Sequence, residues 1–366
     1  MTTFTNVYHR EPAVVTVAPG RVNLIGEHTD YNGGFVLPTV IPQTTQVALG
    51  PRSDSIVRVY SSSYDCGILS YFLEEERPGR EWLDYVQGVT FVLRKMEHQL
   101  SGCDLTIDST VPLGSGLSSS AALDVALLRA FRQAFNLKVD DKEIAILGQS
   151  SENQFVGAHV GIMDPLACSL GELHQALFLD ALSLNYEKVP LPADADFVVI
   201  NSGVSHQHSA GDYNTRRSEC EEASKLLCVK LLRFVELDAL PRINELPEPL
   251  NRRVRHVVTE NARVVDAVAA IKEDDLERLG QLFYASHDSQ RDDYGVSIPE
   301  IDLLVDLAHQ DKEVYGARLT GGGFGGSIVL LAKAGVGQAA AERIAKRYQS
   351  KSGRKATVLA TLTGAV

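Results

Sequence analysis

Residues 111–122, Val-Pro-Leu-Gly-Ser-Gly-Leu-Ser-Ser-Ser-Ala-Ala, combine glycines and hydroxyl groups in a way that suits a phosphate group. Gly114 and Gly116 let the backbone approach a ligand closely, and the hydroxyls of 118–120 can cap the free N–H groups of a following helix. A helix N-terminus presented in this way attracts an anion, because its unpaired N–H donors and the positive end of its dipole point outward. An ordinary capped helix after a glycine turn would have the same composition.

Two common phosphate-binding patterns do not fit the chain. No Gly-Lys pair occurs, so residues 111–122 are not the common P-loop, and the role of its lysine falls to the helix end, a metal ion or an arginine. Residues 317–326, Ala-Arg-Leu-Thr-Gly-Gly-Gly-Phe-Gly-Gly, formally match G-x-G-x-x-G. However, the aliphatic run at 327–331 predicts a strand where a dinucleotide fingerprint needs a helix. This motif is better interpreted as a flexible loop that closes over a ligand or supports another loop.

Residues 20–34, Gly-Arg-Val-Asn-Leu-Ile-Gly-Glu-His-Thr-Asp-Tyr-Asn-Gly-Gly, place many polar side chains between glycines. A core strand could not contain all of them. One interpretation is a solvated hairpin loop that ends at Asn32-Gly33. The other is a loop of hydrogen-bonding groups at the mouth of a sheet, which suits a polyhydroxylated ligand.

Two acidic residues fall near predicted helix ends. Glu152 lies close to the end of a helix predicted for 141–156, and Asp164 stands between apolar neighbours at a turn, directly before Pro165. Asp164 could cap the next helix or take part in chemistry. The residues alone leave both interpretations open.

Hydrophobic periodicity predicts strands and helices around these motifs. We call residues 111–122 the phosphate loop. The alternation at 103–110 predicts a strand before this loop, and the apolar face of 121–135 predicts a helix after it. A strand at 14–17 is expected to end in a turn at Pro19-Gly20. Further strands are expected at 35–48, 55–60, 176–180 and 196–201, a helix at 82–100, and mainly helical stretches at 213–229 and 241–275.

Composition narrows the class of protein. A length of 366 residues favours two domains that share a cleft. The net charge of −12 argues against a nucleic-acid or anionic-membrane surface. Five cysteines without a C-x-x-C pair indicate neither a disulfide framework nor a zinc site. With no evident signal peptide or membrane span, we expect a cytoplasmic protein.

The glycine-rich motifs at 20–34, 111–122 and 317–326 together resemble those of the GHMP small-molecule kinases, and residues 20–31 are similar to the galactokinase signature. Nearly the whole chain follows the family, including 82–86, 161–164, 212–220 and 291–294. The resemblance implies an α+β fold with the active site between two domains. These would be an N-terminal domain like ribosomal protein S5 (1–177, completed by the C-terminal strand 354–366) and a C-terminal ferredoxin-like domain (178–353).

The implied activity is ATP-dependent phosphorylation of the C1 hydroxyl of α-D-galactose, with Arg21 and Asp164 as the catalytic pair. A carboxylate beside the hydroxyl and a positive charge near the developing anion suit this chemistry. Whether Asp164 removes the proton or only orients the hydroxyl stays open.

The other implied site residues match the family position by position. Mg²⁺ would be held by Ser120 and Glu152, because a hard cation takes few oxygen ligands from the protein. The galactose contacts would be Glu27, His28, Asp30, Gly161, Asp164 and Tyr213. The ATP contacts would be Gly114, Ser115, Gly116, Leu117, Ser118, Ser119, Ser120 and Trp82. The expected partners are galactose and MgATP, bound by a monomer.

Two departures and two alternatives accompany the resemblance. Pro165 stands where the family usually has Gln, and Ser327 where it usually has Cys. Galactokinase-like sensors without kinase activity lack an intact Ser-Ala step, which is present here as Ser120-Ala121, so catalysis is favoured. A GHMP kinase for another substrate is disfavoured by residues 27–30, Glu-His-Thr-Asp.

Overall fold

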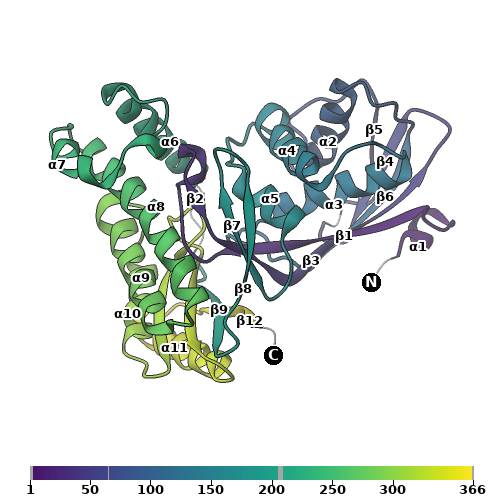
Figure 1. The fold of residues 1–366 in the computed structure, drawn as a ribbon. Helices are drawn as coiled ribbons and strands as arrows, with labels where there is room; N and C mark the ends of the chain where they lie inside the picture. The colour runs from purple at the N-terminus through teal and green to yellow at the C-terminus, as the bar shows by residue number, and fades with distance from the viewer. Residues whose placement is uncertain (1–2, 65, 205–208, 365–366) are drawn as a thin grey trace. The chain divides into compact units, whose positions relative to one another are not determined.

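The computed structural model describes residues 3–64, 66–204 and 209–364, and the chain divides into two units that alternate along the sequence (Figure 1). The first unit runs up to Arg21 and then takes in Pro42–Leu113 and Leu117–Leu170. The second takes in Val22–Ile41, Gly114–Gly116 and the chain from Gly171 onward. The domain boundary expected between residues 177 and 178 stays a prediction.

The first unit contains a sheet with the strand order β3-β6-β4-β5, in which β4 and β6 run parallel. Helices α2 to α5 pack on one another in this unit (Figure 1). The buried residues Leu49, Val59, Leu105, Val89 and Val125 come from these strands and helices. The elements are α1 (Phe4–Tyr8), β1 (Val14–Asn23), β3 (Pro38–Pro51), β4 (Ile56–Ser61), β5 (Leu69–Phe72), α2 (Leu83–Lys95), β6 (Cys103–Ser109), α3 (Ser119–Ala134), α4 (Asp141–Ser151), the π-helical turn η2 (Glu152–Val156) and α5 (Met163–Leu170).

The second unit contains an antiparallel four-stranded sheet with the order β10-β11-β9-β12. Helices α9, α10 and α11 contact this sheet, and α8 packs on α9 (Figure 1). The elements are η1 (Asp30–Asn32), β2 (Phe35–Val36), β7 (Gln175–Asp180), β8 (Tyr186–Pro190), β9 (Ala195–Asn201), α6 (Ser209–Leu226), η3 (Leu232–Phe234), η4 (Leu237–Ala239), α7 (Leu240–Ile243), α8 (Leu250–Lys272), α9 (Leu276–Ser289), the π-helical turn η5 (Gln290–Tyr294), α10 (Pro299–His309), β10 (Val314–Thr320), β11 (Ser327–Lys333), α11 (Gly337–Ser352) and β12 (Thr357–Thr363).

Several predicted elements are confirmed. The strand, loop and helix around the first glycine motif appear as β6, residues 110–118 and α3, and the strand predicted after the last glycine motif appears as β11. The glycines of 321–326 therefore join two strands, which confirms that this is not a dinucleotide fingerprint.

Three local expectations are wrong. The first strand does not turn at Pro19-Gly20 but continues as β1 to Asn23. The helix expected to reach residue 100 ends at Lys95. The C-terminal strand, expected to complete the N-terminal domain, pairs as β12 with β9 in the four-stranded sheet, with Leu362 opposite Phe197. Apolar alternation sets the register of a strand but does not name its partner.

Candidate active site

The N-terminus of α3 lies beside a buried arginine and a carboxylate within the first unit. Ser118 precedes the helix with a left-handed backbone (φ 58°), and its side chain caps no helix N–H group. Its hydroxyl donates instead to Oδ2 of Asp164. The capping role predicted for this serine is therefore wrong, and the helix start keeps N–H donors available for an anion.

Arg21 and Asp164 form a two-point ion pair within the same unit. Nε of Arg21 donates to Oδ1 of Asp164 at 2.8 Å, and a terminal nitrogen reaches Oδ2 at 2.5 Å. The arginine side chain is 5% exposed and the aspartate side chain is 31% exposed, so the carboxylate is the accessible member of the pair. Asp164 lies in the first turn of α5, where Pro165 costs no helical hydrogen bond.

A second acidic group lies where α4 passes into the π-helical turn η2. Burial, followed by the charge of Asp164, raises the pKa of Glu152 to about 7, and a hydrogen bond with Ser120 acts in the opposite direction. Asp124 on α3 is fully buried, and burial and Glu152 raise its pKa. Neither carboxylate oxygen of Asp124 has a hydrogen-bond partner in the described part of the chain.

This donor set fits a hard cation. Carboxylate and hydroxyl oxygens are the ligands that Mg²⁺ prefers, and buried acids of raised pKa gain most from a nearby positive charge. Among the residues that the structure describes, no three His, Cys, Asp or Glu side chains form a metal-binding group. A cation here would need further ligands, as expected for Mg²⁺ that also binds phosphate groups and water.

Trp82 lies at the start of α2 and is half-buried. Its ring stacks on that of Tyr64, with centroids 5.1 Å apart and planes within 3° of parallel. The pair presents aromatic surface in the first unit, and its predicted contact with a nucleotide stays a prediction.

The earlier part of the phosphate loop, residues 114–116, belongs to the second unit and contacts the last glycine motif. A Cβ atom on Gly321 would lie 3.4 Å from the carbonyl oxygen of Gly116. The hydroxyl of Ser327 donates to the carbonyl of Ser115 at 2.8 Å and accepts from Asn201 at 3.1 Å. The last glycine motif therefore supports the phosphate loop, which was one of its two predicted roles.

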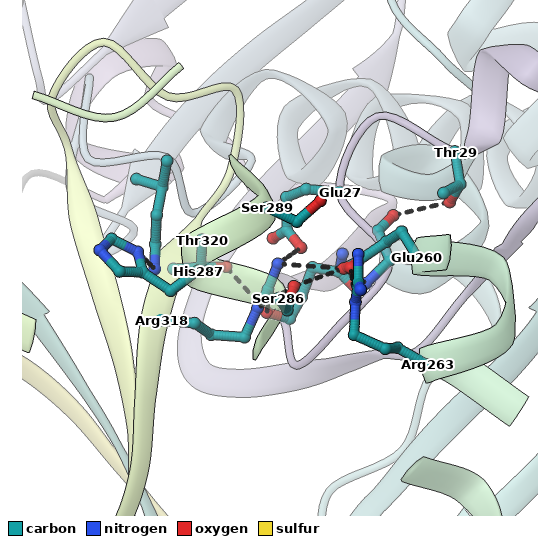
Figure 2. Close-up of polar contacts among 12 residues, drawn as sticks. Glu27, Thr29, Glu260, Arg263, Ser286, His287, Ser289, Arg318 and Thr320 are labelled. Atoms are coloured by element: carbon teal, nitrogen blue, oxygen red, sulfur yellow. Dashed lines mark hydrogen bonds and ion pairs between the residues drawn. The ribbon is translucent and has the colours of Figure 1, made fainter. Parts of the chain in front are cut away.

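The polar loop at 20–34 is almost wholly buried, so it is not a solvated hairpin loop. Figure 2 shows its central interaction, in which Arg318 of β10 contacts both Glu27 and Glu260. Glu27 also accepts from the backbone N–H of Gly321 at 3.0 Å, and Glu260 accepts from that of Gly26 at 3.0 Å. We call Glu27, Glu260, Arg263 and Arg318 the buried charge network; Arg263 donates to Glu260 at 2.7 Å (Figure 2).

Both carboxylate oxygens of Glu27 have partners, because one contacts Arg318 and the other accepts from the N–H group of Gly321. The side chain of Glu27 is 2% exposed. Burial raises the pKa of Glu27, and Arg318 acts against this shift. For Glu260, burial acts to raise the pKa, but Arg263, Arg318 and smaller contributions from His256 and Ser286 together outweigh it and lower the pKa to about 2. Glu27 is thus held as part of the loop framework.

Two of the remaining predicted sugar contacts of the second unit, His28 and Tyr213, belong to an aromatic group. The ring of His28 lies 5.4 Å from that of Tyr213 and 4.8 Å from that of Tyr294. Asp30, half-buried, starts the short helix η1. Gly161, in contrast, belongs to the first unit with Asp164, where it precedes α5.

Some residues of these sites were not singled out as site residues from sequence: Asp124, Glu260, Tyr294 and Arg318. Asp124 lies among the buried, mainly apolar residues of α3. An acidic residue on an apolar helix face is the sequence signal that could have marked it as a site residue. Tyr294 and Arg318 both lie in segments that follow the family, 291–294 and 317–326, but no role was assigned to them.

Comparison with known proteins gives consistent matches along the chain. The galactokinase galactose-binding signature matches residues 2–51, the GHMP kinases N terminal domain matches 84–172, and the GHMP kinases C terminal model matches 267–350. The galactokinase of Chloroflexus aurantiacus is 44% identical to this chain, in an alignment that covers 99% of this chain and 95% of that protein. The galactokinase of a Roseiflexus species is also 44% identical, over 97% of this chain and 92% of that protein. The structure of Lactococcus lactis galactokinase complexed with galactose is 34% identical, with a TM-score of 0.93 over 99% of this chain and 96% of that one.

The charge network predicts a large effect on stability. We expect Arg318→Met to lower the free energy of unfolding by about 3–5 kcal/mol, because it leaves Glu27 and Glu260 buried without their shared cation. The double variant with Arg318→Met and Glu27→Gln is expected to recover part of this loss. Urea unfolding of each variant measures its free energy of unfolding. In the matched control, Arg278→Met removes a surface pair with Asp266 and is expected to cost less than about 1 kcal/mol. Equal losses for the two arginines would contradict the prediction.

Proposed function

The chain belongs to the galactokinase family of the GHMP kinases, and on this premise we propose that it transfers the γ-phosphoryl group of ATP to the C1 hydroxyl of α-D-galactose. The products are galactose 1-phosphate and ADP. This phosphorylation is a first step in galactose breakdown. The observation that carries the proposal is the Arg21–Asp164 pair beside the start of α3. A carboxylate that is accessible and fixed by an arginine is the group that such a phosphoryl transfer needs.

In the proposed reaction the C1 oxygen attacks the γ-phosphorus, and the bond from that phosphorus to the β,γ-bridging oxygen breaks. The hydroxyl proton passes to Asp164, and the bridging oxygen leaves with ADP. Arg21 fixes the carboxylate by two hydrogen bonds and places a positive charge near the developing negative charge. The N–H groups at the start of α3 stabilise the phosphates.

We propose that Ser120 and Glu152 hold Mg²⁺, and that Gly114–Ser120 and Trp82 bind ATP. When bound, Mg²⁺ supplies positive charge to the nucleotide phosphates. The support from this chain is the buried, oxygen-rich surroundings of Glu152, where burial favours a group that compensates its charge.

On the sugar side, we propose His28, Asp30, Tyr213 and the backbone of Gly161 as galactose contacts, with Asp164 at C1. Glu27 acts through the loop that it holds rather than as an accessible contact, because both of its oxygens are already engaged. A phenol and a carboxylate can pair with sugar hydroxyls, so they can distinguish epimers.

We propose further that the protein works in the cytoplasm as a monomer. All five cysteines are free, which fits a reducing compartment. Within the described residues, no helix is both long and apolar enough to cross a membrane. A sensor without kinase activity is disfavoured by the intact Ser120-Ala121 step together with the Arg21–Asp164 pair.

The test of the proposal is ADP release with galactose and ATP. Asp164→Asn is expected to keep the fold and nucleotide binding but to lower kcat at least about a hundredfold, because an amide cannot accept the proton. Arg21→Ala is expected to act similarly, and the double variant to lose less than the product of the single losses. Asp141→Asn, at a surface pair with Arg132, is the control and is expected to retain kcat. Near-normal turnover by Asp164→Asn would overturn the assignment.

The metal assignment is tested by a Mg²⁺ titration of activity. Glu152→Gln is expected to raise the Mg²⁺ concentration for half-maximal rate, since a neutral amide is a poorer ligand for a hard cation. The KM for galactose is expected to move much less. Glu143→Gln, on the exposed start of α4, serves as the control. An unchanged titration for Glu152→Gln would make this residue a helix-end group only.

Sugar selection is tested at Tyr213 and Asp30. Tyr213→Leu is expected to keep activity on galactose and to relax exclusion of glucose, which differs only at C4, because a phenol makes a neutral hydrogen bond. Asp30→Ala is expected to lose activity on every sugar, since a charged hydrogen bond is lost. The measurement is kcat/KM for galactose, glucose and 4-deoxygalactose. An unchanged galactose-to-glucose ratio in Tyr213→Leu would place C4 selection elsewhere.

A further inference from the structure

A chain of hydrogen-bonding side chains runs from His28 to a buried thiol within the second unit. Nδ1 of His28 lies 3.0 Å from the hydroxyl of Tyr31. That hydroxyl lies 2.7 Å from the hydroxyl of Tyr294, which in turn lies 3.1 Å from Sγ of Cys220. His28, Tyr294 and Cys220 are 4%, 0% and 1% exposed. The proposed reaction gives no role to Tyr31, Tyr294 or Cys220.

The imidazole at the end of this chain is neutral. Burial, followed by the charges of His256 and Arg216, lowers the pKa of His28 to about 3. A neutral ring carries one N–H, so either Nδ1 or Nε2 is the donor, and the partner of Nδ1 decides which.

The chemistry of the chain gives it a direction. A phenol donates best to oxygen, whereas sulfur is a weak acceptor and S–H a weak donor. Either atom of each pair could be the donor, and this chemistry favours donation from Tyr294 to the oxygen of Tyr31 and from the thiol of Cys220 to the oxygen of Tyr294. The hydroxyl of Tyr31 is then left with Nδ1 of His28 as its acceptor.

We infer that Cys220, Tyr294 and Tyr31 are positioning residues that hold His28 in the tautomer with its proton on Nε2. His28 then acts as a hydrogen-bond donor to a hydroxyl oxygen of the ligand. That this ligand is galactose rests on the proposed function, whereas the tautomer of the free protein does not.

The surroundings of the ring support this assignment. Nε2 is buried and makes no hydrogen bond of standard geometry with the described residues. The backbone of Gly322 nevertheless interacts with the ring and acts to raise the pKa of His28, against the larger effect of burial. Tyr294 is fixed between two imidazoles, since its ring lies 4.8 Å from that of His28 and 4.4 Å from that of His256. The amide of Asn32 donates to the carbonyl of His28 at 2.8 Å and also interacts with Cys220.

The decisive experiment is nitrogen NMR of the full chain labelled with ¹⁵N-histidine, without ligand, at pH 7. The signals of His28 are assigned by their loss in His28→Gln. We expect a protonated-type signal for Nε2 and an unprotonated-type signal for Nδ1. A protonated Nδ1 in the unsubstituted protein would overturn the inference, whatever the activity of the enzyme.

Tyr294→Phe tests the chain itself. It leaves Tyr31 free to accept from Nδ1, so we expect the His28 signals to shift toward a mixture of tautomers. The Kd for galactose is expected to rise about three- to tenfold, with a smaller change in kcat, as for the loss of one oriented hydrogen bond. Cys220→Ser keeps a donor at the end of the chain and is expected to keep the Nε2–H tautomer.

The control is Tyr284→Phe, which removes another phenol of this unit whose hydroxyl has no hydrogen-bond partner within the described residues. Its His28 signals and Kd are expected to match those of the unsubstituted protein. Unchanged His28 signals and Kd in Tyr294→Phe would overturn the inference. If galactose does not bind the unsubstituted protein, the proposed function fails, and the NMR result still decides the tautomer.

Discussion

The interaction on which the second unit depends is the contact of Arg318 with two buried glutamates. Arg318 is fully buried, and it also donates to the hydroxyl of Ser286 at 3.1 Å and to the carbonyl of Leu24 at 2.9 Å. With Arg263, the network has two positive and two negative charges, so no net charge is buried. It joins β10, α8 and the loop after β1, and it reaches α9 through Ser286, which bonds with both Glu260 and Arg318. A buried ion pair adds little net stability compared with apolar packing, but it specifies one arrangement of the groups that share it. Here that arrangement is the path of residues 23–29.

Each of the three glycine-rich motifs also contains one non-glycine residue with a left-handed backbone. His28, Ser118 and Phe324 have positive φ angles of 64°, 58° and 59°, one in each of the three glycine-rich motifs. Such angles are uncommon for residues with a Cβ atom, and they persist only where the surroundings determine them. At Ser118 the hydrogen bond to Asp164 is such a constraint, and at Phe324 the backbone N–H donates to the carbonyl of Val296 at 2.7 Å. These contacts hold the local path of the chain at Ser118 and Phe324.

The sequence predicted the positions of strands and helices better than the contacts between them. Alternation of Leu105 and Ile107 identified β6, and the aliphatic run after Gly326 identified β11, because both signals are local. The partner of β12 and the burial of residues 20–34 depend on contacts distant in sequence, which periodicity does not contain. In the same way, Arg21 and Asp164 are separated by 143 positions, and only the family resemblance joined them before the structure did.

The two departures from the family have different physical consequences. Pro165 lies in the first turn of α5, where a missing N–H removes no helical bond, so the helix that carries Asp164 is preserved. Ser327 is more consequential, since its hydroxyl holds the carbonyl of Ser115 and also accepts from Asn201. A thiol is a weaker donor and a weaker acceptor than a hydroxyl, and a cysteine would make the same two contacts less strongly. In this chain the substitution therefore strengthens the attachment of the phosphate loop to β11, and with it the position of Gly114–Gly116.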